Sequence, residues 1–295
     1  MGPIKNKLKI LVTGASGFIG HHIVDELVNC GFTVTTLSRN VDFHINGCAA
    51  VAGDLTLAED AERVIAGMDG IVHCAGEKTD ATLLKASNVI TTQNLINAAK
   101  SHGLKRFVHI SSVAVIGNSN ARTIDETTPC DPMNAYGQTK YDSEMIVQGS
   151  NLSAVILRPT NVFGPETVDQ WRSLSKVGGC LNGRENAHLV YVGDIAAAVA
   201  FALEMPENGV ETFIVASDDE PGNTVGAIFT ALTGNTVPFP APLWLSYIIK
   251  RIVYGRVNWG NKVYSSERLK HAGYTPKYGL AEGLRLSNTA TPKSD

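Results

Sequence analysis

The sequence has little of what marks several common protein classes. Its five cysteines, Cys30, Cys48, Cys74, Cys130 and Cys180, are scattered over 295 residues, without the CxxC spacing of zinc sites or the even number of a disulfide framework. The 25 Lys and Arg residues are balanced by 28 Asp and Glu residues, which gives a net charge of −3, and no lysine-rich run is present. We therefore expect reduced thiols, no metal site and no nucleic-acid partner.

Long hydrophobic runs are scarce as well. The most apolar stretch, Val237–Ile249, contains three prolines and falls short of the ~20 apolar residues that a membrane-spanning helix needs. The polar segment Met1–Lys9 leads directly into a strand-like run, which is unlike a secretory signal. Hydrophobic residues make up 44% of the chain and charged residues 18%, which is typical of a globular enzyme. The sequence thus predicts a cytoplasmic protein with no membrane partner.

A glycine-rich segment, Thr13–Gly20 (TGASGFIG), is the most informative local feature. It follows the apolar run Leu8–Val12 and precedes the amphipathic run His21–Asn29, which indicates a turn between a strand and a helix. Glycines at such a turn let the backbone approach a pyrophosphate on the helix N-terminus. The spacing is GxxGxxG rather than the usual GxGxxG, but the context favours a nucleotide site over a purely structural turn.

The first half of the chain alternates apolar and amphipathic segments, which predicts an α/β fold with a doubly wound parallel sheet. The expected strands are Lys9–Val12, Thr33–Leu37, Ala49–Val51, Gly70–His73, Phe107–Ile110 and Ala154–Leu157. The expected helices are His21–Asn29, Glu59–Ala66, Leu83–Ser101 and Ala135–Gln148. After Phe163 the rhythm breaks, and we expect helices at Gln170–Lys176, Asp194–Leu203, Thr224–Leu232 and Leu243–Val253 and a strand at Phe213–Val215.

Tyr136 and Lys140 are four residues apart, which places them on one face of the expected helix. A tyrosine is a poor acid–base group at neutral pH, and a nearby ammonium favours its phenolate. Upstream, the apolar run Val108–Val115 contains the hydroxyl pair Ser111-Ser112. These serines would emerge at the carboxyl edge of the sheet, where ligands of open α/β sheets bind. The pattern favours a catalytic pair over an ordinary surface pair of tyrosine and lysine.

The order and spacing of these motifs resemble those of the extended short-chain dehydrogenases/reductases, in particular the NAD-dependent epimerase/dehydratase family. The resemblance extends from about Lys9 to about Leu203. The matching segments are TGASGFIG (13–20), GDL (53–55), HCAG (73–76), NVITT (88–92), Ser112, the pair Tyr136/Lys140 and RPTNVFGP (158–165). The resemblance implies a Rossmann domain over residues 1–163 that binds NAD(P), and a small, interleaved substrate-binding lobe over residues 164–295. It also implies a homodimer formed through the helices Leu83–Ser101 and Ala135–Gln148.

The same resemblance implies the catalytic residues. Tyr136 exchanges a proton with the reacting oxygen, and Lys140 holds down the tyrosine pKa and hydrogen-bonds the nicotinamide ribose. Ser112 hydrogen-bonds the reacting oxygen. It is preferred to Ser111 because relatives carry this hydroxyl five residues before the glycine at the strand exit, here Gly117. For Ser111 we expect a structural hydrogen bond.

The implied cofactor contacts are, besides Tyr136 and Lys140, Gly14, Ser16, Gly17, Phe18, Ile19, Gly20, Ser38, Arg39, Asp54, Leu55, Cys74, Ala75, Gly76, Lys78, Asn88, Pro159, Asn161 and Val162. NAD-specific folds place an acidic residue after the second strand, whereas an arginine there suits a 2′-phosphate. Ser38-Arg39 stands at this place, so we expect NADP(H) in preference to NAD. Asn88 is either a helix-kink or water-relay residue or an ordinary helix residue. Lys78 either meets a phosphate or is a solvated loop residue.

Two departures from the family pattern bear on the reaction. Dehydratases carry an Asp-Glu pair directly after the catalytic hydroxyl, and the residues here are Val113-Ala114, which argues against dehydration. Sugar-nucleotide epimerases usually carry an arginine for the substrate diphosphate just before the segment matched by Leu189–Asp194. This chain has Ala187-His188 there, with Arg184 a few residues earlier, which weakens that assignment without removing it.

Three functions compete on these features. The motif set, Lys78 and the modest length favour a 4-ketoreductase or 4-epimerase of a nucleotide sugar. Arg39, the missing diphosphate arginine and the apolar stretch Pro240–Ile252 favour a reductase or dehydrogenase of an apolar hydroxy compound, similar to hydroxysteroid dehydrogenases or dihydroflavonol reductases. A cofactor-binding sensor or scaffold would not need the three catalytic groups together. We expect a nucleotide sugar as the substrate.

Overall fold

The structure is a computed structural model that describes residues 8–117, 119–173, 183–236, 242, 244–245, 248, 252 and 261–289. Most of the expected helix Leu243–Val253, the end of Gln170–Lys176 and Cys180 lie outside the described residues. Among the described residues, those of 1–117, 130–158 and 195–213 form one compact unit, and those of 118–129, 159–194 and 214–295 form a second. The division at residue 163 between cofactor and substrate binding stays a prediction.

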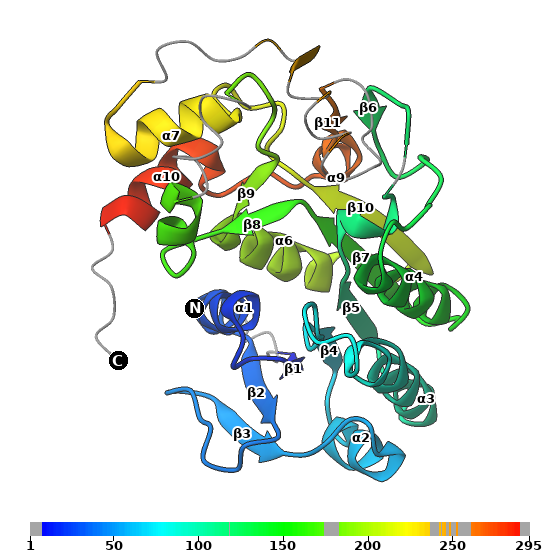
Figure 1. Cartoon of the computed structure of the whole chain (residues 1–295). Helices are drawn as coiled ribbons and strands as arrows, with labels where there is room; N and C mark the ends of the chain where they lie inside the picture. Colours follow the sequence, from blue (N-terminus) through cyan, green and yellow to red (C-terminus); the bar gives the residue numbers. More distant parts are fainter. Residues whose placement is uncertain are drawn as a thin grey trace. The chain divides into compact units, whose positions relative to one another are not determined.

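A seven-stranded sheet, ordered β10-β7-β5-β4-β1-β2-β3, organises the fold (Figure 1). All strand pairs from β7 to β3 are parallel, which confirms the predicted doubly wound α/β class. Its strands are β1 (Lys9–Thr13), β2 (Thr33–Ser38), β3 (Ala49–Ala52), β4 (Gly70–His73), β5 (Arg106–Ile110), β7 (Ala154–Pro159) and β10 (Val210–Val215). The order runs outward in both directions from the boundary between β1 and β4, the position at which such sheets bind ligands beyond their strand ends.

Helices pack on both faces of this sheet because its strands are apolar on both sides. The helices of the first unit are α1 (Phe18–Asn29), α2 (Ala58–Ile65), the π-helical turn η1 (Lys85–Ile90), α3 (Thr91–Ser101), the 3₁₀ turn η2 (Val113–Val115) and α4 (Ala135–Gln148). Leu11, Ile71 and Phe107 share one core cluster with side chains of α2, α3 and α4. Ile10 and Val12, which alternate with Leu11, are also fully buried.

The second unit contains two short parallel pairs that the sequence analysis did not predict. β8 (Asn161–Phe163) pairs with β9 (Leu189–Tyr191), and β6 (Thr123–Ile124) pairs with β11 (Val263–Tyr264). Among the described residues, the further helices are α6 (Val192–Glu204), most of which belongs to the first unit, and α7 (Val225–Thr233), α9 (Glu267–His271) and α10 (Gly279–Thr289) of the second. The Asp194 carboxylate accepts backbone N–H bonds from Tyr278 (2.8 Å) and Gly279 (2.9 Å) and so holds the start of α10.

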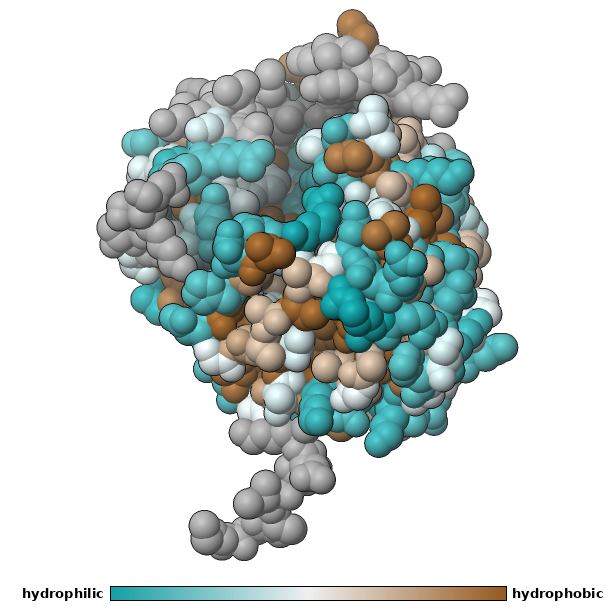
Figure 2. Space-filling view, turned by 90° about the horizontal axis from the view of Figure 1, so that it is seen from below, coloured by the Kyte–Doolittle hydropathy of each residue, from teal (hydrophilic) through white to brown (hydrophobic). Residues whose placement is uncertain are grey.

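Hydrophobic side chains also reach the surface, where they lie between hydrophilic ones on the face seen in Figure 2. Leu83, Ile90 and Met145, on or beside η1 and α4, are 40–42% exposed. Scattered exposure of this kind is normal for a folded protein. Within the described part of the chain, no helix has the length and apolar content that crossing a membrane requires.

Candidate active site

The turn between β1 and α1 has room only for glycine at two positions. Gly14 has φ +70°, and a Cβ there would lie 2.6 Å from the backbone nitrogen of Ala75. A Cβ on Gly20 would lie 2.0 Å from the carbonyl oxygen of Gly14. The first glycine therefore lets the exit of β4 lie against the turn, and the second lets α1 begin close to it.

The beginning of α1 suits an anion. Its N-cap, Gly17, makes no side-chain capping bond, and the first helical turn, which contains Phe18, Ile19 and Gly20, has no acidic residue. Ser16 and Gly17 are exposed. Uncapped backbone N–H groups and the positive end of the helix dipole attract a phosphate. This cradle fits the pyrophosphate of a dinucleotide.

The expected adenosine contacts lie at the ends of β2 and β3. Ser38 accepts a hydrogen bond from Asn40 N (3.0 Å) through its Oγ. The Arg39 side chain is exposed, and no hydrogen bond or ion pair holds it within the described residues. Asp54 accepts bonds from the backbone and hydroxyl of Thr56 (2.9 and 2.8 Å), and Leu55 is buried. Arg39 is therefore free to reach a ligand.

Asn88 connects the exit of β4 to the catalytic helix. It lies in the π-helical turn η1 and is buried. Its amide accepts a bond from Glu77 N (2.8 Å) and donates to Glu77 O and to the Thr139 hydroxyl (both 2.9 Å). These bonds and the helix irregularity favour a helix-kink role for Asn88 over that of an ordinary polar residue of the helix.

The loop after β4 is held by a carboxylate. Glu77 accepts backbone bonds from Lys78, Thr79 and Asp80, at 2.8, 2.7 and 3.1 Å. These hydrogen bonds, the one from Thr79 first, lower the pKa of Glu77 to about 2. Gly76 has no room for a Cβ, which would meet Asn88 Oδ1 at 2.8 Å. The loop thus has one fixed path, from which the exposed Lys78 projects.

Close packing brings Ser112 and Tyr136 together. A Cβ on Gly137 would lie 2.6 Å from Ala114 O, so glycine lets α4 begin directly against η2. Asn134 caps α4 by accepting a bond from Gly137 N (2.8 Å), and Ser112 caps η2 by accepting one from Ala114 N (3.1 Å). The Ser112 hydroxyl acts on the Tyr136 hydroxyl, whose pKa it lowers.

The environment of Tyr136 differs from the expected one. Burial raises the pKa of Tyr136, and the Ser112 hydroxyl opposes this shift only in part. The expectation that Lys140 lowers this pKa is therefore not met in the protein alone. Lys140 is itself buried and donates to Ile110 O (2.6 Å), and burial lowers the pKa of its ammonium to about 8, against the attraction of Cys74 and Glu144.

Sequence reasoning missed a buried charged pair behind these residues. Glu144, one helical turn after Lys140, accepts bonds from Arg158 (2.6 and 3.0 Å) and from the Ser111 hydroxyl (2.5 Å). Both charged side chains are at most 5% exposed. The pair joins α4, the end of β5 and the end of β7. The structural role expected for Ser111 is consistent with this bond.

Two buried histidines were also missed. His73 bonds to the hydroxyls of Thr13 (2.8 Å) and Thr92 (3.0 Å), and His109 bonds to Ser143 (3.1 Å). The ring centroids of the two histidines lie 5.4 Å apart. Burial lowers the pKa of His73 to about 3 and that of His109 well below its usual value. Both are therefore neutral at physiological pH.

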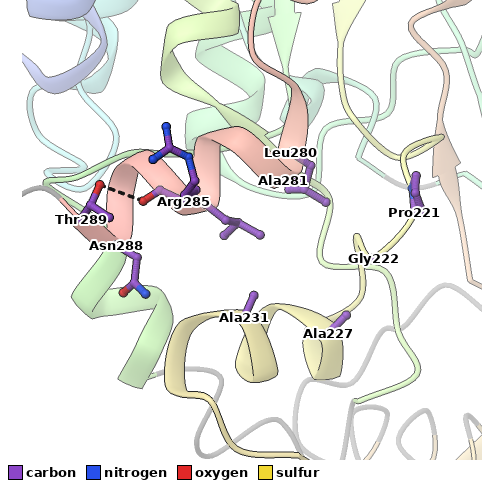
Figure 3. A pocket seen from close by; sticks show the side chains of 10 residues that line it. Pro221, Gly222, Ala227, Ala231, Leu280, Ala281, Arg285, Asn288 and Thr289 are labelled. Atoms are coloured by element: carbon purple, nitrogen blue, oxygen red, sulfur yellow. Dashed lines mark hydrogen bonds between the residues drawn. The ribbon is translucent and has the colours of Figure 1, made fainter.

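The remaining expected contacts, Pro159, Asn161 and Val162, belong to the second unit. The Asn161 amide donates to Ala187 O (3.0 Å), which is a structural bond between β8 and the residues before β9. A groove of about 440 Å³ lies between α7 and α10, and Figure 3 shows its lining of small, apolar and a few polar side chains. It contains none of the expected site residues. No group of His, Cys, Asp or Glu in the described residues could hold a metal ion.

Comparisons with known proteins agree with this geometry. The family model described as "NAD dependent epimerase/dehydratase family" matches residues 10–216. The UDP-glucose 4-epimerase of Vibrio cholerae is 25% identical over 98% of this chain and 97% of its own length. The sterol-4-alpha-carboxylate 3-dehydrogenase (decarboxylating) of Saccharomyces cerevisiae is 27% identical, over 93% and 95%.

A solved structure extends the comparison to the fold. The Thermus thermophilus UDP-glucose 4-epimerase in complex with NAD superposes with a TM-score of 0.72 at 24% identity, covering 95% of this chain and 98% of that one. The glycine turn, the parallel sheet and the family match therefore lead to one conclusion: the chain is an enzyme that belongs to the NAD dependent epimerase/dehydratase family.

Proposed function

We propose that this enzyme moves hydride at a hydroxyl- or keto-bearing carbon of a nucleotide sugar, as a 4-epimerase or a 4-ketoreductase. The observation that carries the proposal is the interaction of Ser112, at the start of η2, with Tyr136 at the start of α4, with Lys140 one turn further along α4. These groups lie at the carboxyl end of the parallel strands, which is the ligand-binding edge of such sheets.

The residues have distinct tasks in this proposal. Gly14–Gly20 would hold the dinucleotide pyrophosphate, Asp54 and Leu55 the adenosine, and Lys140 the nicotinamide ribose; the nicotinamide supplies or accepts the hydride. Tyr136 donates its proton to the carbonyl oxygen in a reduction and withdraws it in an oxidation. Because its pKa is raised, the tyrosine is protonated at neutral pH and is ready to donate. Ser112 donates a hydrogen bond that positions the same oxygen.

Full-length similarity to a UDP-glucose 4-epimerase supports a nucleotide sugar as substrate. Epimerisation and reduction share the proton and hydride steps and differ in the fate of the cofactor. An epimerase returns the hydride to the same carbon and needs only catalytic cofactor, whereas a reductase consumes one reduced cofactor per turnover. The preference for NADP(H) through Arg39 is part of this proposal, and the NAD complex of the Thermus thermophilus relative does not support it.

The test is turnover of a panel of UDP- and dTDP-sugars, including 4-keto sugars, with the oxidised and the reduced forms of NAD and NADP. Products are separated by chromatography, and the reduced cofactor is followed by its absorbance. Epimeric product without net absorbance change identifies an epimerase. Stoichiometric consumption of reduced cofactor with a 4-keto sugar identifies a reductase. The Tyr136→Phe protein is the matched control, and turnover that survives in it contradicts the assigned mechanism.

A second candidate function has one specific observation in its favour. The match to a yeast sterol dehydrogenase covers 93% of this chain, and an apolar hydroxy compound would be oxidised or reduced by the same three residues. Turnover of 3-hydroxysteroids but not of nucleotide sugars would replace the first proposal by this one.

We also propose a homodimer. Two helical segments, η1 with α3 and α4, carry exposed apolar side chains, among them Ile90 and Met145. These side chains suit a helix-to-helix interface between two copies of the chain. Sedimentation velocity at micromolar concentration should give twice the 31.5 kDa chain mass; a single species at the chain mass would contradict the dimer.

A further inference from the structure

Three large apolar side chains of the second unit are exposed at helical spacing. Trp244, Ile248 and Ile252 are 59%, 42% and 78% exposed, and each follows the one before by four residues. All three have helical conformation, as does Leu245, whose backbone N–H donates to Pro242 O (3.0 Å). Because residues four apart lie on one side of a helix, these three side chains form one exposed surface, here called the apolar face.

The sequence of the expected helix Leu243–Val253 is amphipathic around the apolar face. At 3.6 residues per turn, Ile249 and Val253 would extend this face, and the polar Ser246 and Lys250 would fall on the opposite side. A helix of this length rises about 16 Å, which is about half of the hydrocarbon thickness of a bilayer. It is too short to cross a membrane, but a helix of this pattern can lie in the plane of the membrane interface.

The charge around the apolar face is of one sign. From Pro221 to Ser266 the sequence contains no Asp or Glu. The cations within these bounds are Lys250, Arg251, Arg256 and Lys262. Because the whole chain has a net charge of −3, this positive charge is a local feature that follows the apolar residues in the sequence. An apolar helix face with adjoining Lys and Arg residues is typical of segments that bind anionic lipid surfaces.

The same composition favours a lipid surface over a second copy of the chain. Trp and Tyr are enriched where lipid meets water, because each ring has an apolar body and a polar end. The stretch that follows Pro242 contains Trp244, Tyr247, Tyr254 and Trp259. Two copies that met through the apolar face would bring like charges together, with no acidic residue nearby in the sequence to neutralise them. Anionic lipid headgroups supply that neutralisation.

We propose that the apolar face binds the surface of an anionic lipid bilayer. Trp244, Ile248 and Ile252 would insert at the boundary between headgroups and acyl chains, and the adjoining Lys and Arg residues would pair with lipid phosphates. This inference goes beyond the proposed reaction and does not depend on it. It replaces the expectation of no membrane partner, which rested on the lack of a run long enough to span a bilayer and does not apply to a helix in the interface.

Co-sedimentation of the full chain with lipid vesicles tests the proposal. The protein should pellet with vesicles made of equal amounts of phosphatidylcholine and phosphatidylglycerol, and binding should fall as salt is added, because salt screens the charges. It should bind vesicles of phosphatidylcholine alone much more weakly. No binding to the anionic vesicles, or equal binding to both kinds, would overturn the proposal.

Ile252→Asp is the sharpest variant, because it replaces an apolar side chain of the face by a negative charge. Binding to the anionic vesicles should weaken by about 10- to 100-fold, as for the loss of one buried apolar side chain. The matched control is Val41→Asp, since Val41 is 77% exposed but belongs to the first unit; it should bind vesicles as the wild type does. Equal losses in the two variants, or binding of Ile252→Asp within two-fold of wild type, would contradict the inference.

Two further measurements separate charge and self-association from the apolar contact. Lys250→Gln combined with Arg251→Gln keeps the apolar face and should weaken binding to the anionic vesicles by about 10- to 30-fold; unchanged binding would refute the anionic lipid. Sedimentation velocity of Ile252→Asp is run without lipid. A variant that dissociates to single chains, beside a wild-type dimer that ignores vesicles, would show that a second copy covers the face, and the proposal would fail. None of these measurements uses a substrate, so they hold whether or not the proposed reaction is correct.

Discussion

The two units differ in how they enclose their polar side chains. In the first unit, His73 bonds at both ring nitrogens to protein hydroxyls, and Glu144 is surrounded by Arg158 and Ser111. In the second unit, His188 is bonded to Asp218 on one side and open on the other. Polar groups whose hydrogen bonds are all made within the protein fix the position of the chain. A group that is held in place but keeps one unused hydrogen-bonding atom is available to a ligand.

The enclosed groups of the first unit hold the helix that carries the proposed catalytic residues. Glu144 and Ser143 are on the same helix as Tyr136 and Lys140, and they tie this helix to strand ends. Buried charges gain little net stability over apolar side chains, so their value here is to fix the place of α4. The comparison therefore assigns a positioning role to the enclosed groups of the first unit, whereas the imidazole of His188 in the second unit keeps one nitrogen available.

Among the tests of this comparison, we expect the largest effect from Tyr136→Phe. It removes the transferable proton but keeps the ring, so kcat should fall by about 10²- to 10⁴-fold, the range of general acid–base contributions. Dissociation constants for cofactor and for UDP should stay within two-fold. Steady-state kinetics and titration measure the two effects. A variant in which UDP affinity falls while kcat is kept would contradict the acid–base role of Tyr136.

The buried charged pair should respond as a unit. Glu144→Ala leaves the Arg158 guanidinium buried without its partner, which should lower the free energy of unfolding by about 3–5 kcal/mol. Urea unfolding followed by circular dichroism measures this loss. The exposed pair Glu282–Arg285, with side chains 41% and 61% exposed, is the matched control, and Glu282→Ala should leave the free energy of unfolding nearly unchanged, because water screens an exposed pair. Equal losses in the two variants would contradict a special role for burial.

Much of the first unit could be predicted from sequence because its signals are local. The glycine turn, the expected strand Gly70–His73 and the helix Ala135–Gln148 appear where the pattern placed them. In these segments, periodicity and turn chemistry agree with the tertiary packing. The single helix expected over Leu83–Ser101 proved to begin as a π-helical turn around Asn88, because that side chain bonds to the β4 exit, 11 residues away.

The rest depends on contacts between residues distant in sequence. Asp218 and His188 are 30 residues apart, and Ser111 and Glu144 are 33 residues apart, so no local sequence pattern predicts either pair. The raised pKa of Tyr136 is another example, since the motif spacing suggested a lowering by Lys140, whereas burial dominates in the folded chain. A signal did exist for Glu144: it follows Lys140 by four residues, and hence lies on the same helix face.

The neutral histidines predict how stability changes with acid. The pKa of His73 falls from 6.5 in the unfolded chain to about 3 in the fold, so below pH 6.5 the unfolded state binds a proton that the folded state does not. Stability is therefore complete above pH 6.5 and is lost as pH falls toward 3, with a slope of about 1.4 kcal/mol per pH unit for each such histidine. Urea titrations at pH 7.5, 6 and 5 measure how the free energy of unfolding falls with pH. In His109→Leu this slope should be smaller by the contribution of one histidine. An unchanged slope would mean that His109 is charged in the fold.

Arg39→Ala should have the smallest effect, because the side chain is exposed and its charge acts through solvent. An exposed ion pair with a 2′-phosphate contributes about 1 kcal/mol or less, which corresponds to a change of roughly five-fold in affinity. We expect the ratio of dissociation constants for NADPH and NADH, measured by fluorescence titration, to shift toward NADH by that amount, while NADH affinity stays constant. Lys100→Ala removes an exposed cation of α3 that is not among the expected cofactor contacts, and it serves as the control. A ratio that is the same in wild type and Arg39→Ala would show that Arg39 is only a solvated turn residue, and the predicted preference for the phosphorylated cofactor would fail with it.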